Sequence, residues 1–194
     1  MKLLLILLFP VTLLAQNKYG LTPVKLEEYK QSVNTNADNE LVNLASIPGV
    51  VLEIRYATTN NFTGEQIYTL PRAYARKPVA VALKKIQADL KPKGLGLKIF
   101  DGYRPYSATV KFYEVYHDTT YVASPYKGSR HNRGCALDLT LIDLKTGKEL
   151  QMPTEWDSFK KEAWPSTPVA DPKIRANRKL LIDAMEKHGF KVNA

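Results

Sequence analysis

The sequence SRHNRGCALDLTLI, residues 129–142, determines the fold and the chemistry that we expect of this chain. Its first part is polar and contains a glycine, which is typical of a loop, and from Cys135 to Ile142 it alternates as a β-strand does. His131 lies in the loop, and Asp138 lies in the strand. A loop that leads into a strand can bring an imidazole and a carboxylate to one Zn²⁺ ion, since zinc accepts both as ligands. The spacing leaves open a second interpretation, a loop histidine that hydrogen-bonds a strand aspartate.

Helices and short strands are predicted on both sides of this stretch, without a regular βαβ order. The apolar spacing predicts strands over 50–56 and 95–100 and helices over 78–90, 107–117 and 177–187, the second of these capped by Ser107. Such a succession favours the α+β class over a doubly wound sheet.

A second candidate site residue lies in the sequence DGYRP, residues 101–105, directly after a predicted strand. Pro105 disfavours helical geometry at Arg104, so Arg104 is expected in an extended conformation at the strand end. A guanidinium held there could stabilise an oxyanion during hydrolysis through its fixed charge. The alternative is a structural salt bridge between Arg104 and a nearby acid such as Asp101.

The composition of the 194-residue chain is that of an ordinary globular protein, with 44% hydrophobic and 24% charged residues. One cysteine excludes an intramolecular disulfide and a zinc site of four thiolates. The formal net charge is +9, but the lysines and arginines are scattered and no nucleic-acid-binding motif occurs. We therefore expect a basic surface and no nucleic-acid partner.

The N-terminal sequence MKLLLILLFPVTLLA, residues 1–15, has the charged start, apolar run and small final residue of a secretory signal peptide. Residues 16–45 are expected to form an N-terminal lead-in segment, flexible over 32–39, and residues 46–194 the remaining domain. No second apolar run approaches the length of a membrane span. We therefore expect an exported protein, periplasmic or secreted, with no membrane span in its mature chain.

Several segments resemble the zinc D-alanyl-D-alanine dipeptidases, the VanX-like metallopeptidases, and occur in that family's order. Residues 129–138 are similar to its S-x-H-x-x-G-x-A-x-D motif, and residues 101–105 to its D-G-Y-R-P motif. Further similarity covers YATTNNFTG at 56–64, MPTEWDSF at 152–159, and the last helix with the Gly189-Phe190 turn. The resemblance implies a compact α+β domain, with an antiparallel sheet carrying a zinc site and helices around it, as in D,D-carboxypeptidases and the hedgehog signalling domain.

The resemblance also implies a role for each matching residue. It makes His131 and Asp138 zinc ligands, and it makes Arg104 the group that stabilises the tetrahedral intermediate. It assigns the substrate carboxylate to Ser129, and the substrate amino group to Tyr56 and Asp157. The local alternatives are a loop cap for Ser129, a helix cap for Asp157 and a core position for Tyr56. The implied substrate is a small D,D-dipeptide from cell-wall metabolism, and the implied cofactor is Zn²⁺.

The sequence departs from the family after the Gly189-Phe190 turn. The family has an E-x-x-H segment there, which supplies a glutamate base and a third zinc ligand, whereas this chain reads KVNA over 191–194. We expect either a piece of a longer reading frame or a non-catalytic homologue that binds cell-wall peptide. A D,D-carboxypeptidase acting on longer wall peptides is a further alternative, which the dipeptidase-like segments at 56–64 disfavour. Cys135 fills a variable position of the motif and is expected to be buried and unreactive.

Overall fold

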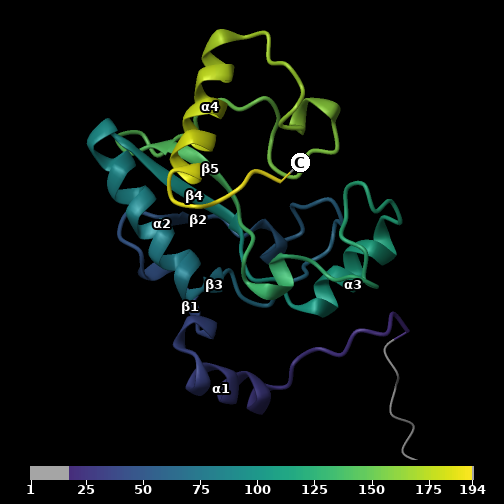
Figure 1. Cartoon of the computed structure of the whole chain (residues 1–194). Helices are drawn as coiled ribbons and strands as arrows, with labels where there is room; N and C mark the ends of the chain where they lie inside the picture. Colours follow the sequence, from purple (N-terminus) through teal and green to yellow (C-terminus); the bar gives the residue numbers. More distant parts are fainter. Residues whose placement is uncertain (1–17, 194) are drawn as a thin grey trace, which may run out of the picture.

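A three-stranded sheet in the order β2–β4–β5 forms the centre of the computed structural model, which describes residues 18–193 (Figure 1). β2 (Val51–Leu52) runs parallel to β4 (Leu95–Asp101), and β5 (Asp138–Asp143) runs antiparallel to β4. A separate antiparallel pair joins β1 (Leu41–Asn43) to β3 (Tyr74–Arg76). The predicted α+β class is confirmed, and the long β4–β5 pair is antiparallel as expected, although β2 makes the sheet mixed.

Four α-helices accompany the strands in the described part of the chain: α1 (Leu26–Thr35), α2 (Lys77–Leu90), α3 (Tyr106–Val115) and α4 (Pro172–Glu186). α2 and α4 contact each other and the central sheet, α2 through β4 and α4 through β5. α3 follows the end of β4, and α1 lies apart from the sheet, below the β1–β3 pair in Figure 1.

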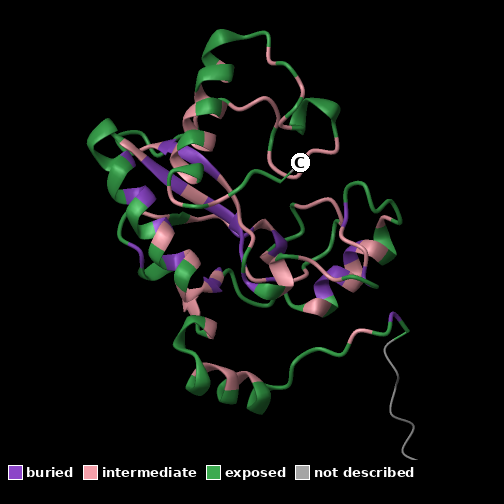
Figure 2. Ribbon diagram, viewed as in Figure 1, coloured by how far each residue is buried: buried purple, intermediate pink, exposed green. Residues whose placement is uncertain are grey.

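The core forms where α2 covers the sheet, because the apolar residues of this helix recur at helical spacing. Pro78 fits the first turn of α2, where a missing N–H costs nothing. The buried side chains Leu83, Ile86 and Leu90 then face Leu97 and Ile99 of β4 within one cluster. Figure 2 shows these buried positions along α2 and the central strands, whereas α1 is exposed or intermediate throughout.

The structure forms a helix where the sequence analysis predicted a flexible segment. α1 includes residues 32–35, and a short 3₁₀ helix follows over Ala37–Asn39. The reason lies in local hydrogen bonds, since the Lys25 N–H donates to Glu28 Oε2 (3.0 Å) and the Asn36 side chain accepts from the Asp38 N–H (3.0 Å). These capping bonds stabilise helical turns that carry no buried residue.

Element boundaries also shift from the predictions. β5 begins at Asp138 instead of Cys135, because His131–Arg133 form a 3₁₀ helix that Gly134 ends in a left-handed conformation, with φ at 68°. α3 begins at Tyr106 with Pro105 at its N-cap, so the predicted capping role of Ser107 is wrong. The strand predicted over 50–56 is two residues long, and a 3₁₀ helix follows it over Arg55–Ala57.

Helices that could cross a bilayer are not found within residues 18–193, where each helix is too short or too polar. The predicted signal peptide, residues 1–15, lies outside the described residues.

Candidate active site

The site lies where the ends of β4 and β5 meet. After an irregularity in the pairing between Ile99 and Asp101, the last residue of β4, Asp101, lies opposite the first residue of β5, Asp138. The 3₁₀ helix that begins at His131 is tied to the same place, because the Arg104 N–H donates to the His131 carbonyl (3.1 Å). Three segments that are separate in the sequence therefore converge on one point.

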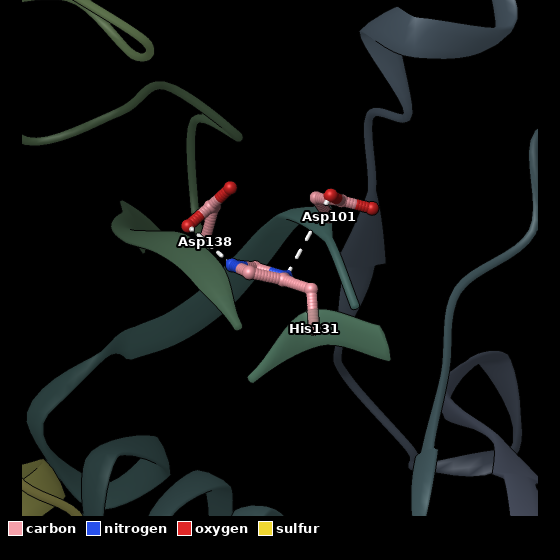
Figure 3. Close-up of side chains that lie close together, drawn as sticks. All are labelled: Asp101, His131 and Asp138. Carbon is pink, nitrogen blue, oxygen red and sulfur yellow. Dashed lines mark ion pairs between the residues drawn. The ribbon is translucent and has the colours of Figure 1, made fainter. Parts of the chain in front are cut away.

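His131 lies between the two carboxylates, with its Nδ1 towards Asp101 and its Nε2 towards Asp138 (Figure 3). Nδ1 is 2.9 Å from the Gly102 carbonyl oxygen, so Nδ1 carries the proton and donates it there. Nε2 lies 3.5 Å from Asp138 Oδ1 and carries the lone pair when the imidazole is neutral. Two ligands of one tetrahedral Zn²⁺, each about 2.0–2.2 Å from the metal, are separated by about 3.4 Å. The separation of these two atoms is therefore compatible with both binding one zinc ion.

Asp101 is close enough to belong to this metal-binding group, but its carboxylate already has partners. Oδ1 accepts from the Tyr68 hydroxyl (2.9 Å) and the Gly102 N–H (2.9 Å), and Oδ2 accepts from Nε (3.0 Å) and Nη2 (2.8 Å) of Arg104. Burial raises the pKa of Asp101, but these donors and the adjacent guanidinium favour its ionised form. Asp101 therefore orients the groups around the metal position and is not itself a free ligand.

The electrostatics of the two candidate ligands are mutually reinforcing. Burial alone would raise the pKa of Asp138, but His131 and Arg104 hold it below its ordinary value. Burial alone would lower the pKa of His131, but Asp138 raises it. Asp138 is therefore anionic near neutral pH, which is the state that a metal ligand requires.

The structural salt bridge, one of the two alternatives for Arg104, is confirmed, because Arg104 pairs with Asp101. Nη2 of Arg104 also lies 3.7 Å from Asp138 Oδ2, so the guanidinium lies beside one of the two candidate metal ligands. Its guanidinium lies 4.7 Å from the Phe112 ring centroid and 5.6 Å from that of Tyr56. Burial would lower the pKa of Arg104, but Asp101 and the other nearby acids raise it, so the charge is permanent.

Tyr56 and Asp157 meet on the other side of Arg104, although they are far apart in the sequence. The Tyr56 hydroxyl donates to Asp157 Oδ2 (2.8 Å), and the Tyr56 ring packs among Phe112, Trp156 and other aromatic side chains. Burial raises the pKa of Asp157 to about 6, so it is still an anion at neutral pH. Its φ is 61°, a left-handed conformation that is uncommon outside glycine and asparagine. Tyr56 is thus a core residue whose hydroxyl reaches the site.

Ser129 caps the histidine loop, because its Oγ accepts from the His131 N–H (3.1 Å). Its side chain also lines the cavity described below, so the loop cap and a contact with substrate are compatible.

One cavity of about 760 Å³ connects all the residues singled out above from the sequence. Its lining includes Tyr56, Arg104, Ser129, His131, Asp138 and Asp157. Cys135 also lines it and is exposed, so the prediction of a buried thiol is wrong. The cause is the late start of β5, which leaves Cys135 in the loop.

Four further residues that shape the site had no assigned function in the sequence analysis: Tyr68, Asp101, Asn132 and Trp156. Tyr68 and Asp101 orient Arg104, and a hydrogen bond from Trp156 helps to lower the pKa of Asp138. Asn132 donates to the Arg104 carbonyl (2.9 Å) and to Thr109 Oγ1 (2.9 Å). The sequence had offered Asp101 as a salt-bridge partner of Arg104, whereas no spacing rule indicates the partner of Trp156.

The other two histidines lie outside this cavity. His117 is exposed, as predicted, with its ring against Tyr113, and His188 Nε2 lies 2.8 Å from Asp89 Oδ2 at the junction of α2 and α4.

Comparisons with known proteins agree with one another. The family model described as D-ala-D-ala dipeptidase matches residues 37–194. The D-alanyl-D-alanine dipeptidase of Escherichia coli (strain K12) is 37% identical over 152 residues, covering 78% of this chain and 78% of that protein. The D-alanyl-D-alanine dipeptidase of Enterococcus faecalis is 31% identical over 162 residues, covering 73% and 80%. That of Enterococcus faecium is 29% identical over 164 residues, covering 74% and 81%.

Proposed function

Since the chain belongs to the D-Ala-D-Ala dipeptidase family of metallopeptidases, we propose that it hydrolyses D-alanyl-D-alanine in a zinc-dependent reaction. The observation that carries the proposal is that His131, Asp138, Arg104 and Asp157 open onto a single cavity. A dipeptide is a zwitterion with a carbonyl between two charged ends. The cavity offers a cation for the carbonyl oxygen and an anion for the ammonium.

His131 and Asp138 are the residues that would hold zinc. Their ligand atoms are 3.5 Å apart, and the Gly102 carbonyl fixes the histidine tautomer that leaves Nε2 available. Zinc bound there supplies a Lewis acid and an acidified water near neutral pH.

Arg104 is placed to stabilise negative charge that develops on the carbonyl oxygen of the scissile peptide bond. Its charge is permanent and its orientation is fixed by Asp101, so little reorganisation accompanies the reaction. Removal of a single preorganised donor of this kind costs about 10²–10³ in kcat.

The ends of the substrate are assigned to residues on two sides of Arg104. The anionic Asp157, held by the Tyr56 hydroxyl, suits the substrate ammonium. Ser129 Oγ already accepts from the His131 N–H, and the Ser129 hydroxyl remains a donor for the substrate carboxylate. Simultaneous contacts of Asp157 with the ammonium and of Ser129 with the carboxylate would restrict the substrate to a dipeptide.

We also propose that the enzyme acts outside the cytoplasm on fragments of the cell wall. Support comes from the signal-like sequence of residues 1–15, together with a substrate that consists of D-amino acids.

The test is the release of D-alanine from D-alanyl-D-alanine by the full chain with one equivalent of Zn²⁺, measured beside a chelator-treated sample. Since KVNA at 191–194 supplies neither the glutamate base nor the third zinc ligand that the family resemblance implies, we expect slow hydrolysis, which the chelator abolishes. We expect a further loss of about 100-fold in kcat for Arg104→Lys, which keeps the charge but not the planar fork. Zinc binding without hydrolysis would instead support the non-catalytic homologue. Faster cleavage of a tripeptide or pentapeptide would support a D,D-carboxypeptidase.

A further inference from the structure

An N-terminal strap, residues 18–21, packs against α3 and against the loop that leads to the active site. The Tyr19 side chain is buried (8% exposed), although Tyr19 lies near the start of the described residues, well before the residues that form the main core. Its ring makes edge-to-face contacts with Tyr113 of α3 (centroids 6.0 Å apart) and with Tyr126 of the loop (5.2 Å apart). The strap thus joins the loop to a helix, beneath α3 in the view of Figure 1.

Polar contacts fix the same end of the strap. The Tyr19 hydroxyl donates to Glu114 Oε1 (3.2 Å), and Lys18 Nζ lies 2.5 Å from the same oxygen. Tyr113, Glu114 and Tyr126 are not among the residues that line the active-site cavity. The strap therefore contacts the wall of the site from outside and leaves the cavity open.

Leu21 reaches the loop at Gly128, directly before Ser129. A Cβ atom placed on Gly128 would be 3.4 Å from Leu21 Cδ1 and 3.3 Å from Asn132 Oδ1. Gly128 is therefore enclosed between the strap and Asn132. Its φ of 70° and its N–H bond to the Ser124 carbonyl (2.9 Å) fix the turn there.

Asn132 links Gly128 to Ser129 and Arg104 through hydrogen bonds of its side chain. Its Oδ1 accepts from the Ser129 N–H (2.7 Å), and its Nδ2 donates to the Arg104 carbonyl (2.9 Å). His131 is its immediate neighbour in the same 3₁₀ helix. A loop that moves at Gly128 would therefore move Ser129 and His131 with it.

We propose that Tyr19 and Leu21 are positioning residues that hold the loop of residues 124–132 in the conformation that presents His131 to the metal. The kinetic and zinc-binding parts of this inference rest on the proposed function, whereas the ordering of the loop does not. The strap acts through Tyr126 and Gly128 and touches neither metal nor substrate.

The experiment compares Tyr19→Ala, Leu21→Ala and Tyr19→Phe with the unaltered full chain by amide hydrogen exchange and by Zn²⁺ titration. In both alanine variants we expect amide exchange over 124–132 to accelerate about tenfold and the Zn²⁺ dissociation constant to rise by a similar factor. Tyr19→Ala removes the ring contacts with Tyr113 and Tyr126, and Leu21→Ala removes the apolar packing at Gly128. Tyr19→Phe keeps both ring contacts and should stay within about threefold of the unaltered protein. Exchange in β4 should not change in any variant.

Val24→Ala is the matched control. Val24 also lies near the N-terminus, three residues after Leu21, but its side chain is exposed (71%). This control should leave both exchange over 124–132 and zinc affinity unchanged. If dipeptide hydrolysis is measurable, Tyr19→Ala should lower kcat more than it raises KM.

The proposal is overturned if both alanine variants keep unaltered exchange over 124–132 and unaltered zinc affinity. It is also overturned if exchange accelerates equally in β4, because the effect is then a general loss of stability. Neither readout depends on turnover, so an inactive protein contradicts the proposed function without affecting this test.

Discussion

Asp101 and Arg104 form a buried ion pair in which one carboxylate oxygen, Oδ2, accepts from both Nε (3.0 Å) and Nη2 (2.8 Å) of the guanidinium. The second oxygen of Asp101 is held by Tyr68 and by the Gly102 N–H. The pair fixes the direction of Arg104, whose Nη2 then lies 3.7 Å from Asp138. Asp101 thus determines the direction of Arg104, the residue proposed to stabilise the oxyanion.

Asp101→Asn tests this dependence, because the amide keeps the size of the side chain and removes its charge. Arg104 would be left as a buried charge without its main partner, so we expect the free energy of unfolding to fall by about 3 kcal/mol. We also expect kcat for D-alanyl-D-alanine to fall more than 10-fold with a small change in KM. Chemical denaturation and steady-state kinetics measure the two effects. Asp183→Asn, which breaks an exposed pair with Lys179, is the control and should change neither quantity appreciably.

Gly102→Ala should disrupt the orientation of His131. A Cβ on Gly102 would lie 2.5 Å from the Tyr74 carbonyl oxygen, a backbone atom that cannot move aside cheaply. The Gly102 carbonyl, which accepts from His131 Nδ1, would shift, and we expect a loss of about 2 kcal/mol in stability and weaker zinc binding.

The matched control for that variant is Gly147→Ala, where φ is 69° but no atom lies within 4 Å of the added Cβ. It should cost only the strain of a left-handed alanine, about 1 kcal/mol, and leave zinc affinity unchanged. Equal zinc affinities for the two variants would contradict the role given to the Gly102 carbonyl.

Asp157 gives the stability of the protein a specific dependence on pH. Burial raises its pKa from 3.8 to about 6, so between these two values the folded state binds more protons than the unfolded state. The contribution of this group to stability is therefore present below pH 4 and is lost as the pH rises through about 6. We expect Asp157→Asn to be more stable than the unaltered protein at pH 7 by about 1–2 kcal/mol, a margin that disappears near pH 4. A pH series of denaturation curves checks this, and a margin independent of pH would contradict it.

The same variant separates stability from substrate binding. Asparagine tolerates the left-handed conformation at this position and can still accept the Tyr56 hydrogen bond, but it has no charge for an ammonium group. We expect KM for the dipeptide to rise at least 10-fold while kcat changes little. An unchanged KM would assign the substrate ammonium to another residue.

Addition of Zn²⁺ should stabilise the folded chain through His131. At a free concentration 100 times the dissociation constant, the gain is about 2.7 kcal/mol, which thermal unfolding with and without the metal measures. His131→Ala should abolish the shift. His188→Ala should retain it, because His188 pairs with Asp89 away from the cavity. Retention of the shift in His131→Ala would place the metal elsewhere.

The sequence predicted the parts of the fold that are governed by local pattern. The helical spacing of α2 and the alternation in β4 could be read directly, because each depends on neighbours a few residues away. The spacing of His131 and Asp138 indicated that the two residues meet but left both a zinc pair and a hydrogen-bonded pair open. The start of α3 was misplaced by one residue and Cys135 was assigned to the core, because both depended on where a loop ends. The turn at Gly134 leaves Cys135 in the exposed loop before β5. The conformation of Gly134 is fixed partly by the close approach of Leu41 and Arg76.

The sequence by itself determined the residue types of the site and the order in which the chain supplies them. Only the tertiary structure decided that Arg104, paired with Asp101, lies beside Asp138, that Asp157 meets Tyr56 and that Tyr19 packs under the active-site loop. Tyr56 and Asp157 are 101 positions apart in the sequence, and Tyr19 and its partner Glu114 are 95 positions apart. Their partners are selected by packing and by the burial of charge, which depend on the assembled core and leave no periodic signal along the chain.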